Sequence, residues 1–371
     1  MLYDAAVIGA GVFGAWTAYH LRQAGLRVSL TDAYGAAHSR ASSGGESRII
    51  RMGYGADEIY TRSAMRSLIL WKQFCERNGQ ALLHQTGVLW TASEADPYTE
   101  KTRQTLARCG ARFEVIGPAE LSSRYPQMNF APGAWGIFEP ESGALMARRA
   151  VQAVVSDAVR QGVHYLREAA PPPCGAGKSG AGVLVFACGP WLPKMFPSLL
   201  ATRIEVTRQE AFFFATPPGD LRFSAPALPV WIDFSDPRGP YGFPDLENRG
   251  VKIALDRHGP PLDPDRADRI PSPDALAAAR AVLGQRMPAL LHAPLVEARV
   301  CQYANTCNGD FLIDRHPDFD NVWLVGGGSG HGFKHGPAVG EYVAARILHG
   351  GPVEPRYSLA SKSETTSRTV F

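Results

Sequence analysis

The sequence predicts an α/β protein of two domains, with a Rossmann-like dinucleotide-binding domain assembled from separate pieces of the chain. Three observations support this fold class. Residues 4–33 read as a strand, a glycine turn, a helix and a second strand; residues 204–255 are rich in strand patterns; residues 321–348 read as a strand, a glycine-rich turn and a helix. The strand-rich middle is therefore expected to form a second, sheet-based domain threaded between the pieces of the first.

The opening stretch has the pattern of a dinucleotide site. An apolar run meets Gly9-Ala-Gly11-Val-Phe-Gly14, a helical pattern follows, and a second apolar run ends at Asp32. In this context Gly9 permits the tight turn, Gly11 lets a pyrophosphate approach the backbone, and Gly14 lets the helix pack closely on the strand. The helix start attracts phosphates, and Asp32 can accept a hydrogen bond from a ribose hydroxyl. The alternative is a glycine-rich turn in a nucleotide-free domain.

A second match to the glycine pattern serves as a control. Gly175-Ala-Gly177-Lys-Ser-Gly180 follows three prolines and precedes the strand-like run 183–186, with no helix after it. Because the surrounding elements are wrong for a nucleotide site, we interpret this match as a flexible turn.

The apolar spacing between the two ends predicts further helices and strands. Helices are expected over residues 59–77, 97–108, 146–161, 271–283 and 338–348, and Gly284 is expected to end the fourth. Strands are expected over residues 86–90, 135–139, 183–188, 205–214, 251–255 and 322–325.

The bulk composition argues against several classes of protein. The chain has 371 residues, 45% of them hydrophobic, and a net charge of +3 without a basic run, which argues against a nucleic-acid partner. No apolar stretch approaches the roughly 20 residues of a membrane span, and the first strand begins too early to leave room for a signal peptide. Six scattered cysteines indicate reduced thiols, so a cytoplasmic location is expected.

The closing glycine turn, Gly326 to Gly332, follows a strand and precedes a helix that begins near Pro337. No dinucleotide register fits it, so we expect it to press against another part of the same cofactor. A helix start near a flavin would stabilise the negative charge that builds on reduction. With one glycine turn at each end of the chain, FAD fits better than NAD. A loop packed for structural reasons is the alternative.

Further motifs are distributed along nearly the whole chain. They are Glu46-Ser-Arg48-Ile-Ile-Arg51-x-x-Tyr54-Gly55, Thr86-Gly-Val-Leu89, Phe138-Glu-Pro-x-Ser142-Gly143, Tyr241-Gly-Phe-Pro244, Val251-Lys252-Ile253, Cys301-x-Tyr303, Asp310-Phe-x-Ile-Asp314 and Gly328-Ser-Gly330-His331-Gly-Phe-Lys334. Together they resemble the monomeric sarcosine oxidase and N-methyltryptophan oxidase group of the FAD-dependent D-amino-acid-oxidase-like family. The resemblance implies a p-hydroxybenzoate-hydroxylase-like fold, with an FAD-binding domain in residues 1–86, 150–203 and 310–371 and a substrate domain in residues 87–149 and 204–309.

The resemblance also implies which residues bind FAD. Cys301 matches the cysteine linked to the flavin 8α-methyl group, whose electrophilic carbon a thiolate can attack; its residue type alone indicates a buried thiol. Arg48 matches a residue packed near the flavin. The residues expected to contact the cofactor are Gly9, Gly11, Gly14, Asp32, Ser43, Arg48, Cys301, Gly328, Gly330 and Lys334.

The substrate-binding residues follow from the same resemblance. Arg51 and Lys334 match the pair that clamps a substrate carboxylate, a task suited to a bidentate arginine and a point-charge lysine. Lys252 matches the lysine that activates oxygen, where a cation stabilises the charge of the first electron transferred. Tyr241 and His331 line the expected substrate cavity. Without the resemblance, the three cations read as solvated surface residues.

Three departures limit the transfer from the family. Four residues after Lys252, sarcosine-type members carry a histidine where this chain has Asp256, which can attract a cationic amine or accept a proton from a ring nitrogen. A surface acid before two prolines is the alternative. The stretch 169–182 replaces a longer hairpin, and Ser43-Gly44 stands where the family has a flavin-proximal histidine. The residues expected to be catalytic are Lys252, Asp256, Tyr241 and Arg48.

These observations predict an FAD-dependent oxidase of an amino acid with a secondary or cyclic amine, pipecolate-like rather than sarcosine, that reduces O2 to hydrogen peroxide. The resemblance points to a monomer. The alternatives are a demethylating oxidase of N-methyl amino acids, a dehydrogenase that uses a non-oxygen acceptor, and a flavin-binding subunit without catalysis. No metal is expected. A zinc site is rejected because Cys-x5-Cys is not a spacing of structural sites; its ligands would be Cys301, Cys307, His331 and His335.

Overall fold

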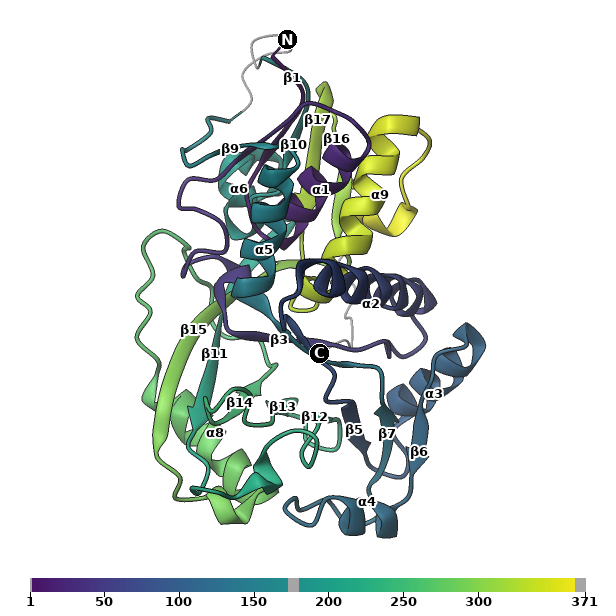
Figure 1. Ribbon diagram of the computed structural model, residues 1–371, viewed down its shortest axis with the longest axis vertical. Helices are drawn as coiled ribbons and strands as arrows, with labels where there is room; N and C mark the ends of the chain where they lie inside the picture. Colours follow the sequence, from purple (N-terminus) through teal and green to yellow (C-terminus); the bar gives the residue numbers. More distant parts are fainter. Residues whose placement is uncertain (1, 173–179, 364–371) are drawn as a thin grey trace.

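The computed structural model describes residues 2–172 and 180–363 and contains three β-sheets with helices packed against them. The two larger sheets lie at opposite ends of the molecule in Figure 1. This arrangement confirms the predicted mixed α/β fold class. Most of the Gly175–Gly180 match, residues 175–179, lies outside the described residues.

The six-stranded sheet holds the dinucleotide motif. Its order is β16-β17-β10-β1-β2-β9, and each neighbouring pair is parallel except β16 with β17. The chain passes from β1 to β2 on one side, whereas β10 lies on the other, so the turn after β1 opens at a topological switch point, where α/β sheets bind ligands. The strands are β1 (Tyr3–Ile8), β2 (Val28–Thr31), β9 (His164–Leu166), β10 (Ala181–Phe186), β16 (Leu312–His316) and β17 (Phe319–Gly326).

Three helices accompany this sheet in the upper part of Figure 1, and the first of them contacts both of the others. They are α1 (Val12–Gln23), α5 (Ala147–Arg160) and α9 (Gly336–His349). A Cβ on Gly340 of α9 would lie 2.5 Å from the backbone carbon of Trp16 in α1. The glycine therefore lets the opening and closing helices approach closely.

The eight-stranded sheet draws its strands from two stretches of chain, residues 88–139 and 204–306. Its order is β15-β11-β14-β13-β12-β5-β7-β6, antiparallel apart from the β12–β5 pair. The helix α8 (Pro273–Arg286) packs on β11 and β14, and α4 (Pro118–Arg124) packs on β7. The strands are β5 (Val88–Ala92), β6 (Glu114–Ile116), β7 (Trp135–Glu139), β11 (Ile204–Phe214), β12 (Val230–Asp233), β13 (Pro240–Phe243), β14 (Val251–Leu255) and β15 (Leu295–Thr306).

The third sheet, β3-β8-β4, combines both predicted domains. Strand β8 (Gly143–Met146) comes from the range predicted for the substrate domain, and it pairs with β3 (Ser47–Ile50) and β4 (Leu83–His84) from the range predicted for the FAD domain. This sheet does not separate the two predicted ranges, so the domain boundaries proposed from the sequence stay a prediction. The remaining helices are α2 (Glu58–Asn78), α3 (Pro97–Cys109), α6 (Leu192–Met195) and α7 (Pro197–Leu200).

One predicted helix end is wrong. Helix α8 continues to Arg286, so Gly284 lies inside it, where an added Cβ would come within 2.4 Å of Leu291. The helix ends instead just before Met287, which precedes Pro288, because the residue before a proline is disfavoured in the helical conformation.

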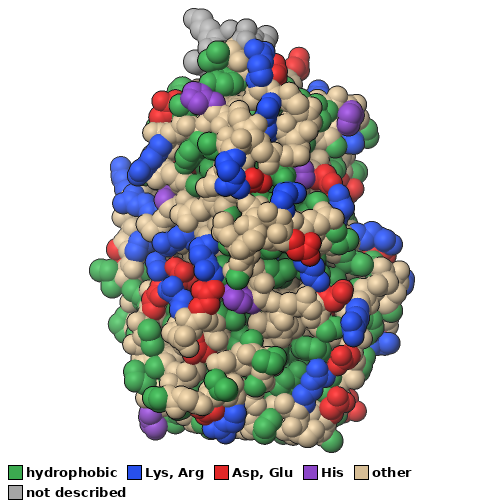
Figure 2. All heavy atoms as spheres, in the orientation of Figure 1, with side chains coloured by type: hydrophobic (Ala, Val, Ile, Leu, Met, Phe, Trp, Pro, Cys, Tyr) green, Lys and Arg blue, Asp and Glu red, His purple; other side chains and the backbone are tan. Residues whose placement is uncertain are grey.

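Among the described residues, no helix combines the length and apolarity that a membrane crossing requires. The cysteines in this part of the chain are free thiols. Basic and acidic side chains are interspersed over the face in Figure 2.

Candidate active site

The glycine turn after β1 borders a large cavity. Gly9 has a φ of +105°, and an added Cβ would lie 2.4 Å from the carbonyl oxygen of Ala187. A Cβ on Gly14 would lie 1.8 Å from the carbonyl oxygen of Gly9, so α1 packs directly on the turn. Helix α1 has no side-chain hydrogen bond at its N-cap, although the N–H of Val12 donates to Ser43 Oγ at 3.0 Å.

This cavity has a volume of about 340 Å³ and is lined by both glycine turns. Asp32 lies on its wall, where the carboxylate accepts hydrogen bonds from the backbone N–H groups of Ala10 and Gly35. Most residues predicted to bind the cofactor line it: Gly9, Gly11, Asp32, Ser43, Arg48, Cys301, Gly328 and Gly330. Gly14 instead packs behind the turn, and Lys334 lines an adjoining cavity.

Cys301 and Arg48 meet on the wall of this cavity. Cys301 lies on β15, and its Sγ is 3.1 Å from Arg48 Nη2. The Arg48 guanidinium also donates to the carbonyl oxygens of Ser42 and Ser47, both at 2.8 Å. The Arg48 guanidinium therefore places a positive charge directly beside the Cys301 sulfur.

A second, smaller cavity of about 60 Å³ adjoins the first. The two share the wall residues Arg48, Tyr303, Gly330 and Phe333. Every residue predicted to bind or transform the substrate lines the smaller cavity: Arg48, Arg51, Tyr241, Lys252, Asp256, His331 and Lys334. The fold therefore brings together residues that lie far apart in the sequence.

Two buried cations, Arg51 and Lys334, line this cavity. Arg51 is 3% exposed, and its guanidinium lies 4.7 Å from the Tyr54 ring centre and 4.6 Å from that of Trp90. Lys334 is 4% exposed, and its Nζ donates to the Tyr54 hydroxyl at 2.7 Å and to the His331 carbonyl oxygen at 3.0 Å. Because the Lys334 Nζ also lies 5.1 Å from the Tyr54 ring centre, both cations approach the same ring, and together they favour an anionic ligand in the cavity.

The buried carboxylate of Glu139 fixes the segment that carries Arg51. It accepts hydrogen bonds from the N–H groups of Met52 at 2.7 Å and Gly53 at 3.0 Å, and from Trp90 Nε1 at 2.9 Å. The Arg51 guanidinium also donates to the carbonyl oxygen of Gly53. These contacts hold the arginine in one orientation, as a preorganised binding group requires.

Asp256 follows β14 and lines the small cavity. Its Oδ1 accepts a hydrogen bond from the Tyr303 hydroxyl at 2.8 Å, and its N–H donates to the Gly239 carbonyl oxygen at 3.0 Å. Burial raises the pKa of Asp256 to about 6, although the Tyr303 hydrogen bond and the charges of Arg51 and Lys334 oppose this change. A carboxylate with such a pKa can exchange a proton near neutral pH.

Lys252 lies on β14 itself, and its ammonium group is buried. The Nζ atom donates to the Ser47 carbonyl oxygen at 3.0 Å and lies 4.3 Å from the Phe243 ring centre. Burial, with the charge of Arg48, lowers the pKa of Lys252 to about 7. Burial also raises the pKa of Tyr241, which keeps its hydroxyl protonated.

The ring of His331 contacts protein groups behind the cavity. Its Nε2 lies 3.1 Å from the Gly309 carbonyl oxygen and its Nδ1 lies 3.3 Å from the Tyr54 hydroxyl. His335 Nε2 lies 2.7 Å from the same hydroxyl, so both histidines surround Tyr54. Cys307 is elsewhere, with its Sγ 3.1 Å from the Lys362 carbonyl oxygen. Within residues 2–172 and 180–363, no group of three His, Cys, Asp or Glu side chains could hold a metal.

The family model described as "FAD dependent oxidoreductase" matches residues 4–346 of the chain. The chain belongs to this family. It is 30% identical to human peroxisomal sarcosine oxidase, over 97% of this chain and 95% of that protein. It is 29% identical to monomeric sarcosine oxidase of a Bacillus species, over 92% of each, and 27% identical to N-methyl-L-tryptophan oxidase of Citrobacter koseri, over 93% and 94%.

Two solved structures share the fold of this chain. L-proline dehydrogenase from P. horikoshii matches with a TM-score of 0.84 and 21% identity over 96% of each chain. The amino acid oxidase NikD of nikkomycin biosynthesis matches with a TM-score of 0.77 and 20% identity, over 96% of this chain and 97% of that one. The predicted family and fold are confirmed.

The large cavity of this FAD-dependent oxidoreductase suits its cofactor. Glycines without Cβ atoms, a helix start and the Asp32 carboxylate are the groups that bind pyrophosphate and ribose. Apolar side chains, among them Ile8, Phe13 and Phe333, offer surfaces for aromatic rings. The residues that would hold FAD are those on this wall, with Arg48 and Cys301 near the junction of the two cavities.

Three residues of the site had no role assigned from the sequence. Glu139, Tyr54 and Tyr303 occur in motifs of the resemblance, but their functions depend on partners distant in sequence. The sequence did contain a signal for Glu139. This acid lies between Phe138 and Pro140 at the end of an apolar strand, and an acidic residue is unusual in a buried strand.

Proposed function

We propose that this enzyme oxidises the C–N bond of a small amino acid with a secondary or cyclic amine, and that it reduces O2 to hydrogen peroxide. The observation that supports it best is that three of the charged groups lining the small cavity suit an amino acid: the cations Arg51 and Lys334 and the carboxylate Asp256. An amino acid zwitterion has the complementary charges, a carboxylate and a protonated amine.

In this proposal Arg51 and Lys334 hold the substrate carboxylate, and Asp256 accepts the proton of the amine. Deprotonation leaves a lone pair on nitrogen, and loss of the hydrogen on the adjacent carbon with two electrons then gives an imine. When bound, FAD supplies the acceptor for these two electrons. The Glu139 contacts keep Arg51 in place, so that the substrate is oriented before it reacts.

The cavity supports a compact, ring-shaped substrate. Its volume is about 60 Å³, and apolar groups from Ile49, Ile232 and Phe333 form part of the wall. Asp256 stands where sarcosine-type members have a histidine, and a relative of similar fold is a proline dehydrogenase. We therefore propose a cyclic secondary amino acid, pipecolate-like or a dehydro-derivative.

The second candidate is an N-methyl amino acid oxidase, favoured by the relatives named sarcosine oxidase at about 30% identity. Anaerobic titration of the purified enzyme with proline, pipecolate, sarcosine and N-methyl amino acids separates the two. Selective bleaching of the flavin by a cyclic amino acid supports the first proposal, whereas a pronounced preference for sarcosine overturns it.

Lys252 supports oxygen as the electron acceptor. A buried ammonium group stabilises negative charge that develops on dioxygen, and its pKa of about 7 keeps a protonated fraction at neutral pH. Hydrogen peroxide measured under air, in the amount of substrate consumed, tests this. Turnover only with an artificial acceptor would instead identify a dehydrogenase.

Cys301 is proposed to link FAD covalently. Its thiol lies on the cavity wall beside the Arg48 guanidinium. No side chain fits at Gly44, where a Cβ would lie 2.0 Å from the His38 carbonyl oxygen, so a histidine there would require the loop to move. Yellow colour that stays with the acid-precipitated protein, and is released in Cys301→Ser, supports the link.

We also propose a monomer in the cytoplasm, which size-exclusion chromatography and cell fractionation test.

A further inference from the structure

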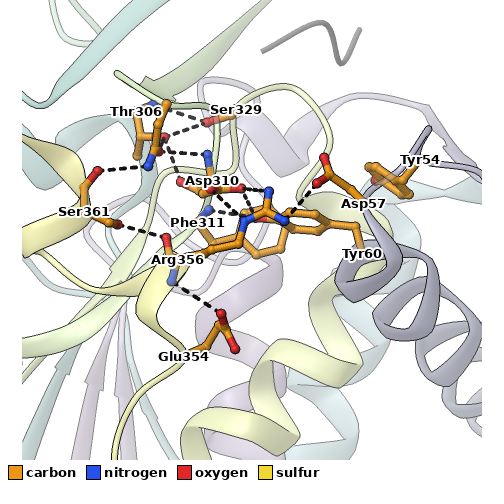
Figure 3. A network of polar contacts seen from close by, with 12 residues as sticks. Tyr54, Asp57, Tyr60, Thr306, Asp310, Phe311, Ser329, Glu354, Arg356 and Ser361 are labelled. Atoms are coloured by element: carbon orange, nitrogen blue, oxygen red, sulfur yellow. Dashed lines mark hydrogen bonds and ion pairs between the residues drawn. The ribbon is translucent and has the colours of Figure 1, made fainter. Parts of the chain in front are cut away.

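Arg356 is not among the residues that line either cavity. It joins two acidic side chains from distant parts of the chain (Figure 3). It follows α9 in the short helical turn Pro355–Tyr357. Its Nη2 donates to Asp310 Oδ1 at 2.8 Å and its Nε to Asp310 Oδ2 at 3.1 Å, while its Nη1 donates to Asp57 Oδ1 at 2.8 Å. One guanidinium thus fixes two carboxylates at once.

The first connection leads from Asp310 to Lys334. The preceding residue, Gly309, accepts a hydrogen bond from His331 Nε2 at 3.1 Å through its carbonyl oxygen. The His331 carbonyl oxygen in turn accepts from Lys334 Nζ at 3.0 Å. The Tyr60 hydroxyl also supports Asp310. It donates to Asp310 Oδ1 at 2.9 Å and accepts a hydrogen bond from the N–H of Phe311, the residue after Asp310.

The second connection leads from Asp57 to the same ammonium group. Asp57 precedes α2, and its N–H donates to the Tyr54 carbonyl oxygen at 2.9 Å in a tight turn. The Tyr54 hydroxyl accepts from Lys334 Nζ at 2.7 Å. Both routes from the Arg356 guanidinium therefore end on Lys334 Nζ, one through a carbonyl oxygen and one through a hydroxyl.

We propose that Arg356 is a positioning residue for the substrate carboxylate: by bridging Asp57 and Asp310 it fixes the Tyr54 hydroxyl and the His331 carbonyl oxygen that orient Lys334. This inference rests on the proposed function, in which Lys334 binds that carboxylate. It differs from a role in folding alone, because the segment after α9 has other anchors. Glu354 N–H donates to the Tyr342 hydroxyl at 2.7 Å, and Leu359 N–H donates to Asp314 Oδ2 at 2.8 Å.

The variants Arg356→Gln and Arg356→Lys separate bridging from charge. Glutamine removes the cation, whereas lysine keeps it but cannot present a planar fork to two carboxylates. Arg66→Gln is the matched control, because Arg66 makes a two-point ion pair with Glu341 between α2 and α9 without touching the cavities. If Arg356→Gln fails to fold, Tyr60→Phe takes its place. This variant removes the hydrogen bond from the Tyr60 hydroxyl to Asp310 and leaves the ion pair between Arg356 and Asp310 intact.

The readout is calorimetric binding of tetrahydrofuran-2-carboxylate, a ring carboxylate without an amine, to each purified holoenzyme. We expect Kd to rise about tenfold in Arg356→Gln, less in Arg356→Lys, and not in Arg66→Gln, the range typical of residues that act at one remove from a ligand. KM for the oxidised amino acid should rise with Kd, while kcat changes less.

A wild-type Kd in Arg356→Gln, or equal weakening in Arg66→Gln, would overturn the inference. Failure of the proposed function looks different: the wild-type enzyme would bind the carboxylate but would not be reduced by any secondary amino acid. A wild-type enzyme that binds no carboxylate would overturn both.

Discussion

The substitution Asp256→Asn tests whether this carboxylate is a base retained at a cost in stability. Asparagine preserves the shape and can still accept the Tyr303 hydrogen bond, but it cannot take up a proton. Burial raises the pKa of Asp256 from the usual 3.8 to about 6. Because one pKa unit corresponds to about 1.4 kcal/mol, the ionised carboxylate destabilises the folded enzyme by up to about 3 kcal/mol at neutral pH.

The sign of the pH dependence follows from the raised pKa. The folded enzyme binds this proton more tightly than the unfolded chain, so the penalty is absent below about pH 4 and complete above about pH 6. With an unfolding entropy of about 2.1 cal/mol/K per residue over 371 residues, Asp256→Asn should melt up to about 4 °C higher at pH 7. The gain should vanish towards pH 4.

The same substitution should lower activity. Loss of a general base reduces kcat/KM by about 10²- to 10⁴-fold, and the decline of wild-type kcat/KM below about pH 6 should disappear. Thermal melts from pH 4 to pH 8 and anaerobic reduction by the amino acid measure the two effects. Asp318→Asn, at an aspartate that is 80% exposed, is the control and should change neither. A variant that melts lower at pH 7, or reacts at the wild-type rate, would refute the reasoning.

Three further substitutions probe other parts of the site. Lys252→Met should slow reoxidation by O2 about 10²-fold and leave anaerobic reduction intact in stopped-flow experiments; in the wild type, reoxidation should slow above about pH 7, as Lys252 loses its proton. Lys334→Gln should raise KM by about 10- to 100-fold in steady-state assays, with a smaller effect on kcat, because one charge-assisted hydrogen bond to the carboxylate is lost. Gly14→Ala should abolish FAD binding, because the new Cβ would lie 1.8 Å from the Gly9 carbonyl oxygen. Visible absorbance of the purified protein measures this. The control Gly117→Ala places its Cβ in open space and should retain the flavin.

Local sequence patterns predicted the parts of the fold whose causes are local. The positive φ of Gly9 and the contact of Gly14 with the Gly9 carbonyl oxygen are local features, so spacing alone indicated both. The end of α8 was missed because two signals competed. Gly284 resembled a helix stop, but it lies inside α8, where the missing side chain makes room for Leu291. The proline at residue 288 determines where the helix ends.

Long-range partners could not be read from the sequence. The hydrogen bond between Asp256 and Tyr303 joins residues 47 positions apart, and it exists because a loop after β14 meets β15 across the cavity. Likewise, Tyr54 received no role, because its importance comes from Lys334, which lies 280 positions later. The resemblance supplied candidate residues, whereas their ionisation depends on burial, which only the folded chain determines.

The order of strands in the six-stranded sheet has a consequence for biosynthesis. β1 pairs with β10, and β10 pairs with β17, so the walls of the large cavity come from both ends of the chain. A nascent polypeptide on the ribosome therefore has no complete flavin site until residues 326–333 have emerged from the exit tunnel. FAD therefore loads only after residues 326–333 have been translated, and a transcript truncated before β17 would yield a protein that cannot take up flavin, however well its opening motif folds.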